Sequence, residues 1–254
     1  MPKLLGVDAD QAATTMHGFD YTSIAVGKLG ASEYTFAGIV MDITTSVGPF
    51  KAGLEKMLET ALGSLQKSPR VLNLLARTTA FNSMVGIEEF HGFTLLNSID
   101  PTGFKNLIQP GGMTNLRDAT LEMVESVNDC ATKLFDDEVI MNANSIIYLM
   151  TDGDDNSSRH KIDDVREGIA AIRRAEALES IQIILIGIND ADPHFRKKLE
   201  KYQLDVGIDK YIKMGDVTEN KLAKLGGLIS QSTTTTSTNL GTGNPSQDVN
   251  NFKF

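Results

Sequence analysis

The stretch FAGIVMDITTS, residues 36–46, decides the fold that this chain is expected to adopt. Its first part, residues 36–41, contains only apolar or small residues, which is typical of a strand buried on both faces of a parallel sheet. Asp42 ends this run, and Thr44 and Ser46 follow it at alternate positions. Ligands bind to α/β sheets beyond the carboxyl ends of the strands, so these oxygen-bearing side chains lie where a ligand site is expected.

Two further segments of the chain supply oxygen donors. Residues 145–150 (SIIYLM) have the character of a second buried strand, and Asp152 follows it closely. Thr114 comes after the pair Gly111-Gly112, at the start of a helical pattern. Together the segments supply two carboxylates and three hydroxyls, which are hard oxygen ligands of the kind that Mg²⁺ and Mn²⁺ select. We therefore expect one metal site for Mg²⁺ or Mn²⁺, with Ca²⁺ a poorer fit, built from Asp42, Thr44, Ser46, Thr114 and Asp152.

Strand-length apolar runs alternate with stretches of helical period from residue 34 onward. This alternation predicts an α/β fold, a doubly wound and mostly parallel sheet of about five or six strands with helices on both faces. Residues 71–81 and 84–96 have strand character around a short turn, which predicts a hairpin and one antiparallel edge strand. The last helix is expected around residues 222–229.

The two ends of the chain differ from this pattern. Residues 1–33 show little periodicity beyond a short strand near residues 21–26, and we expect them to form an N-terminal extension. Residues 231–254 are rich in Ser, Thr, Asn and Gly, which bury too little apolar surface to offset the entropy of ordering. This segment is expected to be a flexible tail, with Phe252 and Phe254 as anchors for a partner. The domain itself then spans residues 34–230.

Composition limits the classes of partner. The formal net charge of −9 disfavours a nucleic acid, because phosphate binding depends on clustered Lys and Arg. No run reaches the roughly 18 consecutive apolar residues of a membrane span, and the first residues lack the pattern of a signal peptide. We expect a soluble cytoplasmic protein without a membrane or nucleic-acid partner. The single cysteine, Cys130, lies on an apolar helical stripe, which predicts a buried structural thiol.

The order and spacing of the three segments resemble the von Willebrand factor A (VWA) domain family. In that family a metal-ion-dependent adhesion site (MIDAS) consists of Asp-x-Ser-x-Ser after the first strand, a Thr on a second loop and an Asp on a third. Asp42, Thr44 and Ser46 match the first element, Thr114 the second and Asp152 the third. Thr44 departs from the usual Ser, but it keeps the hydroxyl and adds a methyl group. The resemblance covers residues 34–230 and implies a Rossmann-like VWA fold.

The resemblance also implies a function. The chain is expected to be a non-enzymatic module for protein–protein recognition. The bound cation would accept the carboxylate of an acidic side chain that a partner protein presents. The segments at 81–83 (FNS), 110–112 (PGG) and 151–156 (TDGDDN) look most like those of bacterial and phage intracellular members. By analogy with those members, the expected partner is a kinase, a phosphatase or an ATPase.

Other interpretations of the same residues remain open. The pattern Asp-x-Thr-x-Ser is also typical of a helix cap. Asp152, Asp154, Asn156 and Asp163 approximate the spacing of a calcium loop, although a serine occupies the place of its glycine. In the favoured interpretation, residues 154–156 instead form an acidic rim that helps to select the partner by charge.

Two alternative functions also remain. The chain could be a metal-independent scaffold or assembly component, of a phage or secretion type, that docks through its tail or its N-terminal extension. It could also be a metal-assisted hydrolase, in which an open Mg²⁺ polarises a phosphoryl oxygen. The second alternative needs a general base, and the sequence around the expected site offers only carboxylates.

Overall fold

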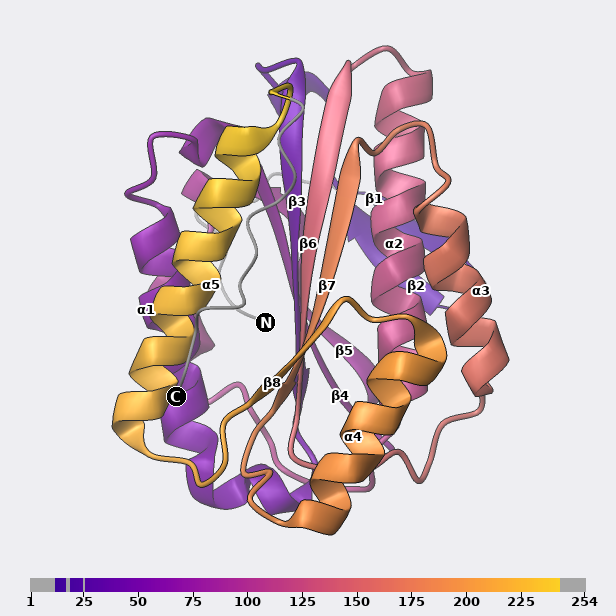
Figure 1. Cartoon of the computed structure of the whole chain (residues 1–254). Helices are drawn as coiled ribbons and strands as arrows, with labels where there is room; N and C mark the ends of the chain where they lie inside the picture. The colour runs from indigo at the N-terminus through magenta and orange to yellow at the C-terminus, as the bar shows by residue number, and fades with distance from the viewer. Residues whose placement is uncertain (1–11, 17–18, 25, 243–254) are drawn as a thin grey trace.

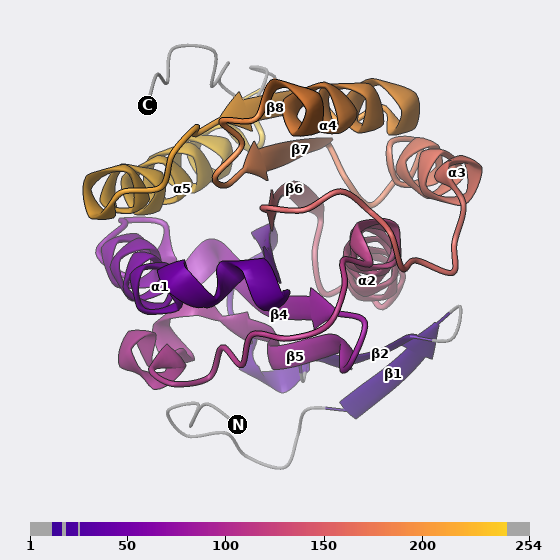
Figure 2. The ribbon, with the colours of Figure 1, turned by 90° about the horizontal axis from the view of Figure 1, so that it is seen from below.

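The computed structural model describes residues 12–16, 19–24 and 26–242. Its centre is a six-stranded sheet between two layers of helices (Figures 1 and 2). The strand order is β5-β4-β3-β6-β7-β8, and only the edge pair β4–β5 is antiparallel, which confirms the predicted α/β fold. The strands are β3 (Glu33–Asp42), β4 (Leu74–Asn82), β5 (Gly86–Leu95), β6 (Asn142–Thr151), β7 (Ser180–Gly187) and β8 (Lys210–Lys213).

Helices cover both faces of this sheet. On one face lie α1 (Lys51–Leu65) and α5 (Glu219–Asn239), and on the other lie α2 (Leu116–Asp136), α3 (Ile162–Ile172) and α4 (Pro193–Val206) (Figure 1). Successive side chains of a strand point to opposite faces, so each central strand contributes to both cores. In β3, Ile39 packs into the core with α1 and α5, whereas Val40 packs into the core with α2 and α3. The uninterrupted apolar character of residues 36–41 follows from this double burial.

Short 3-10 helices connect several of these elements. They are η1 (Val26–Lys28), η2 (Thr45–Phe50), η3 (Val71–Asn73), η4 (Leu96–Ser98) and η5 (Pro101–Phe104). The most important is η2, because it follows β3 at the carboxyl edge of the sheet, the edge that faces the viewer in Figure 2.

An antiparallel hairpin precedes the main sheet. It consists of β1 (Ala12–Met16) and β2 (Phe19–Ser23), and the second strand corresponds to the one expected near residues 21–26. The hairpin packs on the α2 side of the molecule through aromatic contacts. The rings of Tyr21 and Phe93 meet edge to face with centroids 6.0 Å apart, and the ring of Phe19 lies 5.5 Å from that of His160.

Helix α5 contradicts the expectation of a flexible tail over residues 231–239. These residues complete a 21-residue helix, and Ser232, Thr233, Thr236 and Ser237 are buried in it. Strand β6 supplies polar partners for the first three of them. The hydroxyl of Tyr148 lies 2.6 Å from Ser232 Oγ and 2.9 Å from Thr233 Oγ1, and Asn144 Nδ2 donates to the Thr236 carbonyl at 2.7 Å. Hydrogen bonds therefore replace the apolar burial that this segment lacks. Residues 243–254, with Phe252 and Phe254, lie outside the described residues.

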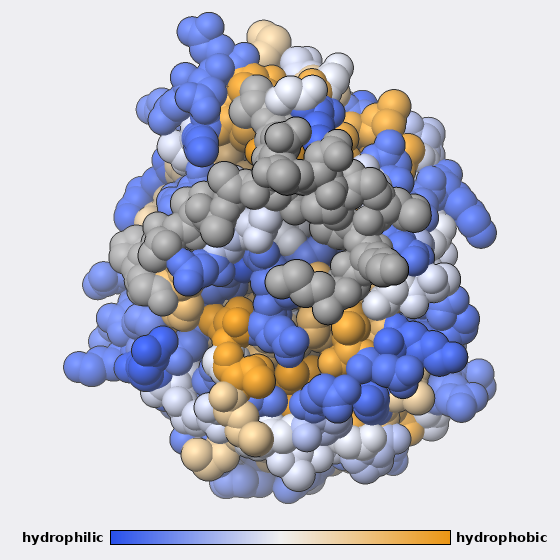
Figure 3. All heavy atoms as spheres, turned by 180° about the vertical axis from the view of Figure 1, so that it is seen from behind, coloured by the Kyte–Doolittle hydropathy of each residue, from blue (hydrophilic) through white to orange (hydrophobic). Residues whose placement is uncertain are grey.

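In the part of the chain that the structure describes, no helix combines the length and the apolar character needed to cross a membrane. The face seen from behind is largely hydrophilic, with an apolar area near its centre (Figure 3).

Cys130 is buried on α2, as predicted, and burial raises the pKa of its thiol to about 12.

Candidate metal site

Asp42 lies at the centre of the candidate site, at the carboxyl end of β3. Strands β3 and β6 are parallel neighbours with Met41 opposite Met150, so Asp42 and Thr151 end adjacent strands side by side. Asp42 is only 2% exposed, and its carboxylate accepts two hydrogen bonds. Its Oδ1 accepts the backbone N–H of Thr44 at 2.8 Å, and its Oδ2 accepts the Thr151 hydroxyl at 2.6 Å. These bonds fix the carboxylate and turn the chain toward η2.

Two hydroxyls converge on Asp152 directly beside this carboxylate. Thr44 Oγ1 and Ser46 Oγ are 3.1 Å apart, and both can donate to Asp152 Oδ1, at 3.4 Å and 2.9 Å respectively. Thr44 is the N-cap residue of η2, but its side chain makes no capping hydrogen bond. The helix-cap interpretation requires these hydroxyls to accept hydrogen bonds from the amides of the helix. They turn toward Asp152 instead.

Thr114 enters the site from the loop before α2. Its backbone N–H donates to Asn156 Oδ1 at 2.9 Å, and its carbonyl accepts the Asn156 N–H at 3.0 Å. Its hydroxyl lies against Gly153, where an added Cβ would come within 2.5 Å of Thr114 Oγ1. The absence of a side chain at Gly153 thus lets Thr114 approach the residue that follows Asp152. The structure brings all five predicted residues to one edge of the sheet.

The electrostatics of the two carboxylates favour a cation. Burial, together with the neighbouring charge of Asp152, raises the pKa of Asp42 to about 6, although the hydrogen bonds from Thr151 and Thr44 lower it. Burial also raises the pKa of Asp152. Among the described residues, no Lys, Arg or His forms an ion pair with either carboxylate. Two poorly hydrated carboxylates without a positive partner are the setting in which a divalent cation binds.

The donor set also fits the expected ions. Within the described ranges, no group of three or more His, Cys, Asp or Glu side chains is arranged to hold a metal. Two carboxylates and three hydroxyls instead make a site of oxygens only, which suits Mg²⁺ or Mn²⁺ with some of its waters retained.

Three residues outside the predicted set of metal ligands support the site. Thr151 holds Asp42, Gly153 makes room for Thr114, and Asn156 fixes the backbone of Thr114. The position of Thr151 was the one available signal, because it ends the apolar run immediately before Asp152. Its contact with Asp42 depends on the pairing of β3 with β6, which the sequence does not specify.

The prediction that residues 154–156 form an acidic rim with free negative charge is wrong, because basic side chains of the same chain pair with both aspartates. Asp154 pairs with Lys198 of α4 at 2.7 Å. Asp155 pairs with Arg117 at 2.7 Å and accepts its backbone N–H at 2.8 Å, so it fixes the start of α2. Two carboxylates of the calcium-loop interpretation, those of Asp154 and Asp163, form ion pairs with basic residues of α4 and α3, with Arg166 at 2.6 Å from Asp163.

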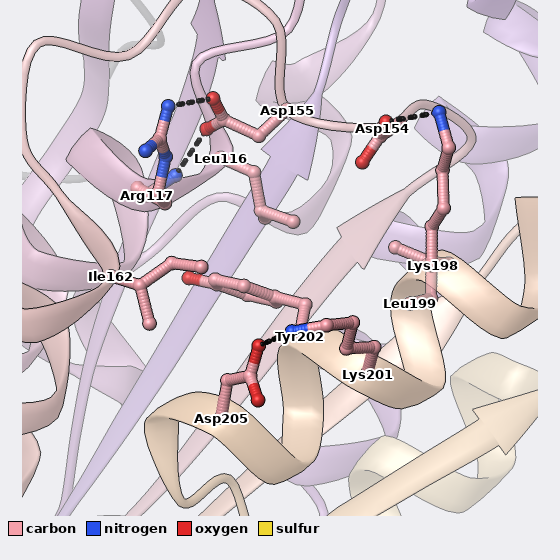
Figure 4. Close-up of a pocket in the computed structure, with 10 residues that line it drawn as sticks. All are labelled: Leu116, Arg117, Asp154, Asp155, Ile162, Lys198, Leu199, Lys201, Tyr202 and Asp205. Atoms are coloured by element: carbon pink, nitrogen blue, oxygen red, sulfur yellow. Dashed lines mark hydrogen bonds and ion pairs between the residues drawn. The ribbon is translucent and has the colours of Figure 1, made fainter.

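A cleft of about 330 Å³ lies beside the site, between the loop after Asp152 and helices α2, α3 and α4 (Figure 4). Apolar side chains and the Tyr202 ring lie between three ion pairs, of Arg117 with Asp155, Lys198 with Asp154, and Lys201 with Asp205 (Figure 4). Each charged side chain that lines the cleft therefore has an oppositely charged partner within the chain. The lining residues are Leu116, Arg117, Asp154, Asp155, Ile162, Lys198, Leu199, Lys201, Tyr202 and Asp205.

Comparisons with known proteins identify the fold. No family model and no curated protein sequence matches the chain. Among solved structures, it is similar to the PilB minor pilin from Streptococcus sanguinis (a D319A mutant), with a TM-score of 0.57 and 14% identity over 81% of this chain and 62% of that chain. It is also similar to the pilus adhesin SpaC from Lactobacillus rhamnosus GG in an open conformation, with a TM-score of 0.61 and 9% identity over 89% of this chain and 34% of that chain.

A third similar structure is proximal thread matrix protein 1 from the mussel byssus, solved with zinc in its MIDAS motif. Its TM-score is 0.52, with 15% identity over 81% of this chain and 47% of that chain. The chain has a VWA-like α/β fold. It spans less than two thirds of each of these proteins, and such low identities establish the fold alone.

Proposed function

We propose that this chain is a metal-dependent protein recognition module with a MIDAS at the carboxyl edge of its sheet. The observation that carries the proposal is the cluster in which Thr44 and Ser46 converge on Asp152, beside the buried and unneutralised Asp42. The zinc in the MIDAS motif of the mussel protein supports a divalent cation at the corresponding place in this fold. For this chain we propose Mg²⁺ or Mn²⁺, held by Asp42, Thr44, Ser46, Thr114 and Asp152.

Each residue has a defined part in this proposal. The hydroxyls of Thr44, Ser46 and Thr114 provide direct oxygen ligands. Asp42 and Asp152 provide the charge, either directly or through water. When bound, the cation supplies an open coordination position for the carboxylate of a partner protein. The hydroxyl of Thr151 keeps Asp42 in place before the cation arrives.

The proposed partner is therefore a protein that presents an Asp or Glu side chain. The names of the similar proteins, a pilin, a pilus adhesin and a thread matrix protein, support a role in recognition or assembly rather than catalysis. A kinase, phosphatase or ATPase as partner, a cytoplasmic location and a bacterial or phage origin stay predictions from the family resemblance.

Calorimetric titration with Mg²⁺ and with Mn²⁺ tests the site. The wild-type protein should bind the ion saturably, and Asp42→Ala and Ser46→Ala should lose this binding while keeping the circular dichroism of the folded protein. Asp163→Ala is the matched control, because its carboxylate is 73% exposed and lies on α3. The site is refuted if the wild type shows no saturable binding or if the control loses as much affinity as Asp42→Ala.

A further inference from the structure

Three exposed apolar side chains lie on the two loops beside the candidate metal site. Met84 is 76% exposed, Val85 53% and Met113 55%, and we refer to these three residues as the Met patch. They are three of the six large apolar side chains that are exposed in the described part of the chain. Single exposed apolar residues are ordinary on a protein surface, but their gathering at one site is typical of a contact surface.

The patch is held in place by hydrogen bonds of its backbone. Asn82, which is 1% exposed, accepts the N–H groups of Met84 and Val85 on its Oδ1, at 2.8 Å and 2.9 Å. Ser83 joins the turn to the second loop in both directions, because its N–H donates to the Met113 carbonyl and its Oγ accepts the Met113 N–H, each at 2.8 Å. The apolar side chains are therefore presented by an ordered pair of loops.

The same loops contact the segment that carries the proposed metal ligands. Asn82 Nδ2 donates to the Ile43 carbonyl at 3.2 Å, and the Gly111 N–H donates to the same carbonyl at 3.0 Å. Thr45 Oγ1 donates to the Gly112 carbonyl at 3.3 Å. Met113 immediately precedes Thr114, so the patch and the proposed ligand are one residue apart, about 3.8 Å between Cα atoms.

Gly112 permits this close approach of the two loops. Its φ of +69° is a left-handed conformation that favours glycine, and an added Cβ would lie 2.9 Å from Ser83 Oγ and 3.0 Å from Met84 Cγ. Met84 consequently packs over Gly111 and Gly112, in the loop that leads to Thr114. The flexible thioether of methionine adapts to side chains of different shapes.

We propose that the Met patch binds a large apolar side chain located one or two residues from the acidic residue that the partner presents. This inference rests on the proposed function and specifies its partner class: a segment that combines a carboxylate with an adjacent Leu, Ile, Met or Phe. A carboxylate that reaches the site past Thr114 brings its neighbouring residues over Met113 and Met84. The cation then selects the acidic group, and the patch selects the residue beside it.

Selection from a library of short random peptides with one fixed Asp, in the presence of Mn²⁺, tests this inference. The proteins compared are the wild type, the double variant Met84→Ser/Met113→Ser and the control Met141→Ser. Met141 is 72% exposed but immediately precedes β6, at the opposite edge of the sheet. All three substituted residues are exposed, so the fold should be retained, and calorimetric titration with Mn²⁺ alone should give the same affinity for all three proteins.

The wild type and Met141→Ser should enrich large apolar residues next to the fixed Asp, and the double variant should not. A synthetic peptide of the selected sequence should bind the double variant roughly tenfold more weakly, the scale of one partly buried apolar side chain. Metal-dependent binding without an apolar preference, or with the same preference in the double variant, overturns the inference and leaves the proposed function intact. If Mn²⁺ binds but no peptide binds with it, the proposed function fails and the inference fails with it.

Discussion

The buried carboxylate of Asp42 should make the metal-free protein less stable than a variant without the charge. Burial raises its pKa from 3.8 to about 6, so above pH 6 the folded chain holds a charge that the unfolded chain solvates better. At about 1.36 kcal/mol per pKa unit, this shift corresponds to about 3 kcal/mol of lost stability. The penalty is complete above pH 6 and disappears as the pH falls toward 3.8, because the native carboxyl takes up its proton first.

Asp42→Asn removes the charge at almost constant size. Its amide oxygen can still accept the N–H of Thr44, while the hydroxyl of Thr151 can accept from the new NH₂ group. In EDTA at pH 7.5 we expect the free energy of unfolding, measured by urea denaturation, to rise by about 1–3 kcal/mol, the upper value being the full charge penalty. Asp163→Asn serves as the control, because its exposed ion pair contributes at most about 1 kcal/mol.

Addition of Mn²⁺ should reverse the order of stability. At a thousandfold excess over the dissociation constant, binding stabilises the wild type by about 4.1 kcal/mol, whereas Asp42→Asn should gain little. The reasoning is refuted if Asp42→Asn is less stable than the wild type in EDTA, or if Mn²⁺ stabilises both proteins equally. Either result would mean that the raised pKa of Asp42 does not reflect an uncompensated charge at a metal site.

Three other predictions concern single positions. Burial lowers the pKa of His91 to about 4, so the stability that its neutral form provides is complete above pH 6.5 and falls by up to about 3 kcal/mol between pH 6.5 and 4. The variant His91→Gln should therefore lose less stability than the wild type between pH 7 and 4. Parallel denaturation profiles of the two proteins over this range would contradict the prediction. Gly153→Ala should weaken Mn²⁺ binding about tenfold or more in calorimetry, because the new Cβ displaces the hydroxyl of Thr114. The control Gly227→Ala should bind Mn²⁺ normally, because no atom lies within 4 Å of its added Cβ. Equal affinities of the two variants would show that Thr114 is not a ligand. Cys130 should react with a thiol reagent only after unfolding, because it is buried and its pKa is raised to about 12, and fast labelling of the folded protein would refute this assignment.

The parts of the site that the sequence predicts are those encoded by local pattern. Asp42 and Asp152 follow runs that must be buried on both faces, so their place at the carboxyl edge follows from the runs themselves. The contact between Thr151 and Asp42 is different, because it requires β6 to lie next to β3. The hairpin β4–β5 lies between them in sequence but pairs on the other side of β3, and no local pattern specifies that order.

The acidic residues after Asp152 show a second limit of sequence-based prediction. Composition reveals the charges of Asp154 and Asp155 but not the basic residues that neutralise them. Lys198 is 44 residues from Asp154, and Arg117 is 38 residues from Asp155. In the folded chain these two carboxylates therefore join the loop after Asp152 to helices α2 and α4 beside the cleft.

Helix α5 shows why a polar composition does not by itself predict disorder. The rule assumes that a segment without apolar side chains has nothing to offset the entropy of ordering. Here the hydroxyls of Ser232 and Thr235 donate to the carbonyls four residues earlier, at 2.6 Å and 2.9 Å, and the buried hydroxyls meet Tyr148 on the sheet. The buried hydroxyls of Ser232, Thr233 and Ser237 thus have partners, so their burial costs little. The decisive information is in β6, where Asn144 and Tyr148 interrupt the apolar face that would otherwise demand an apolar helix.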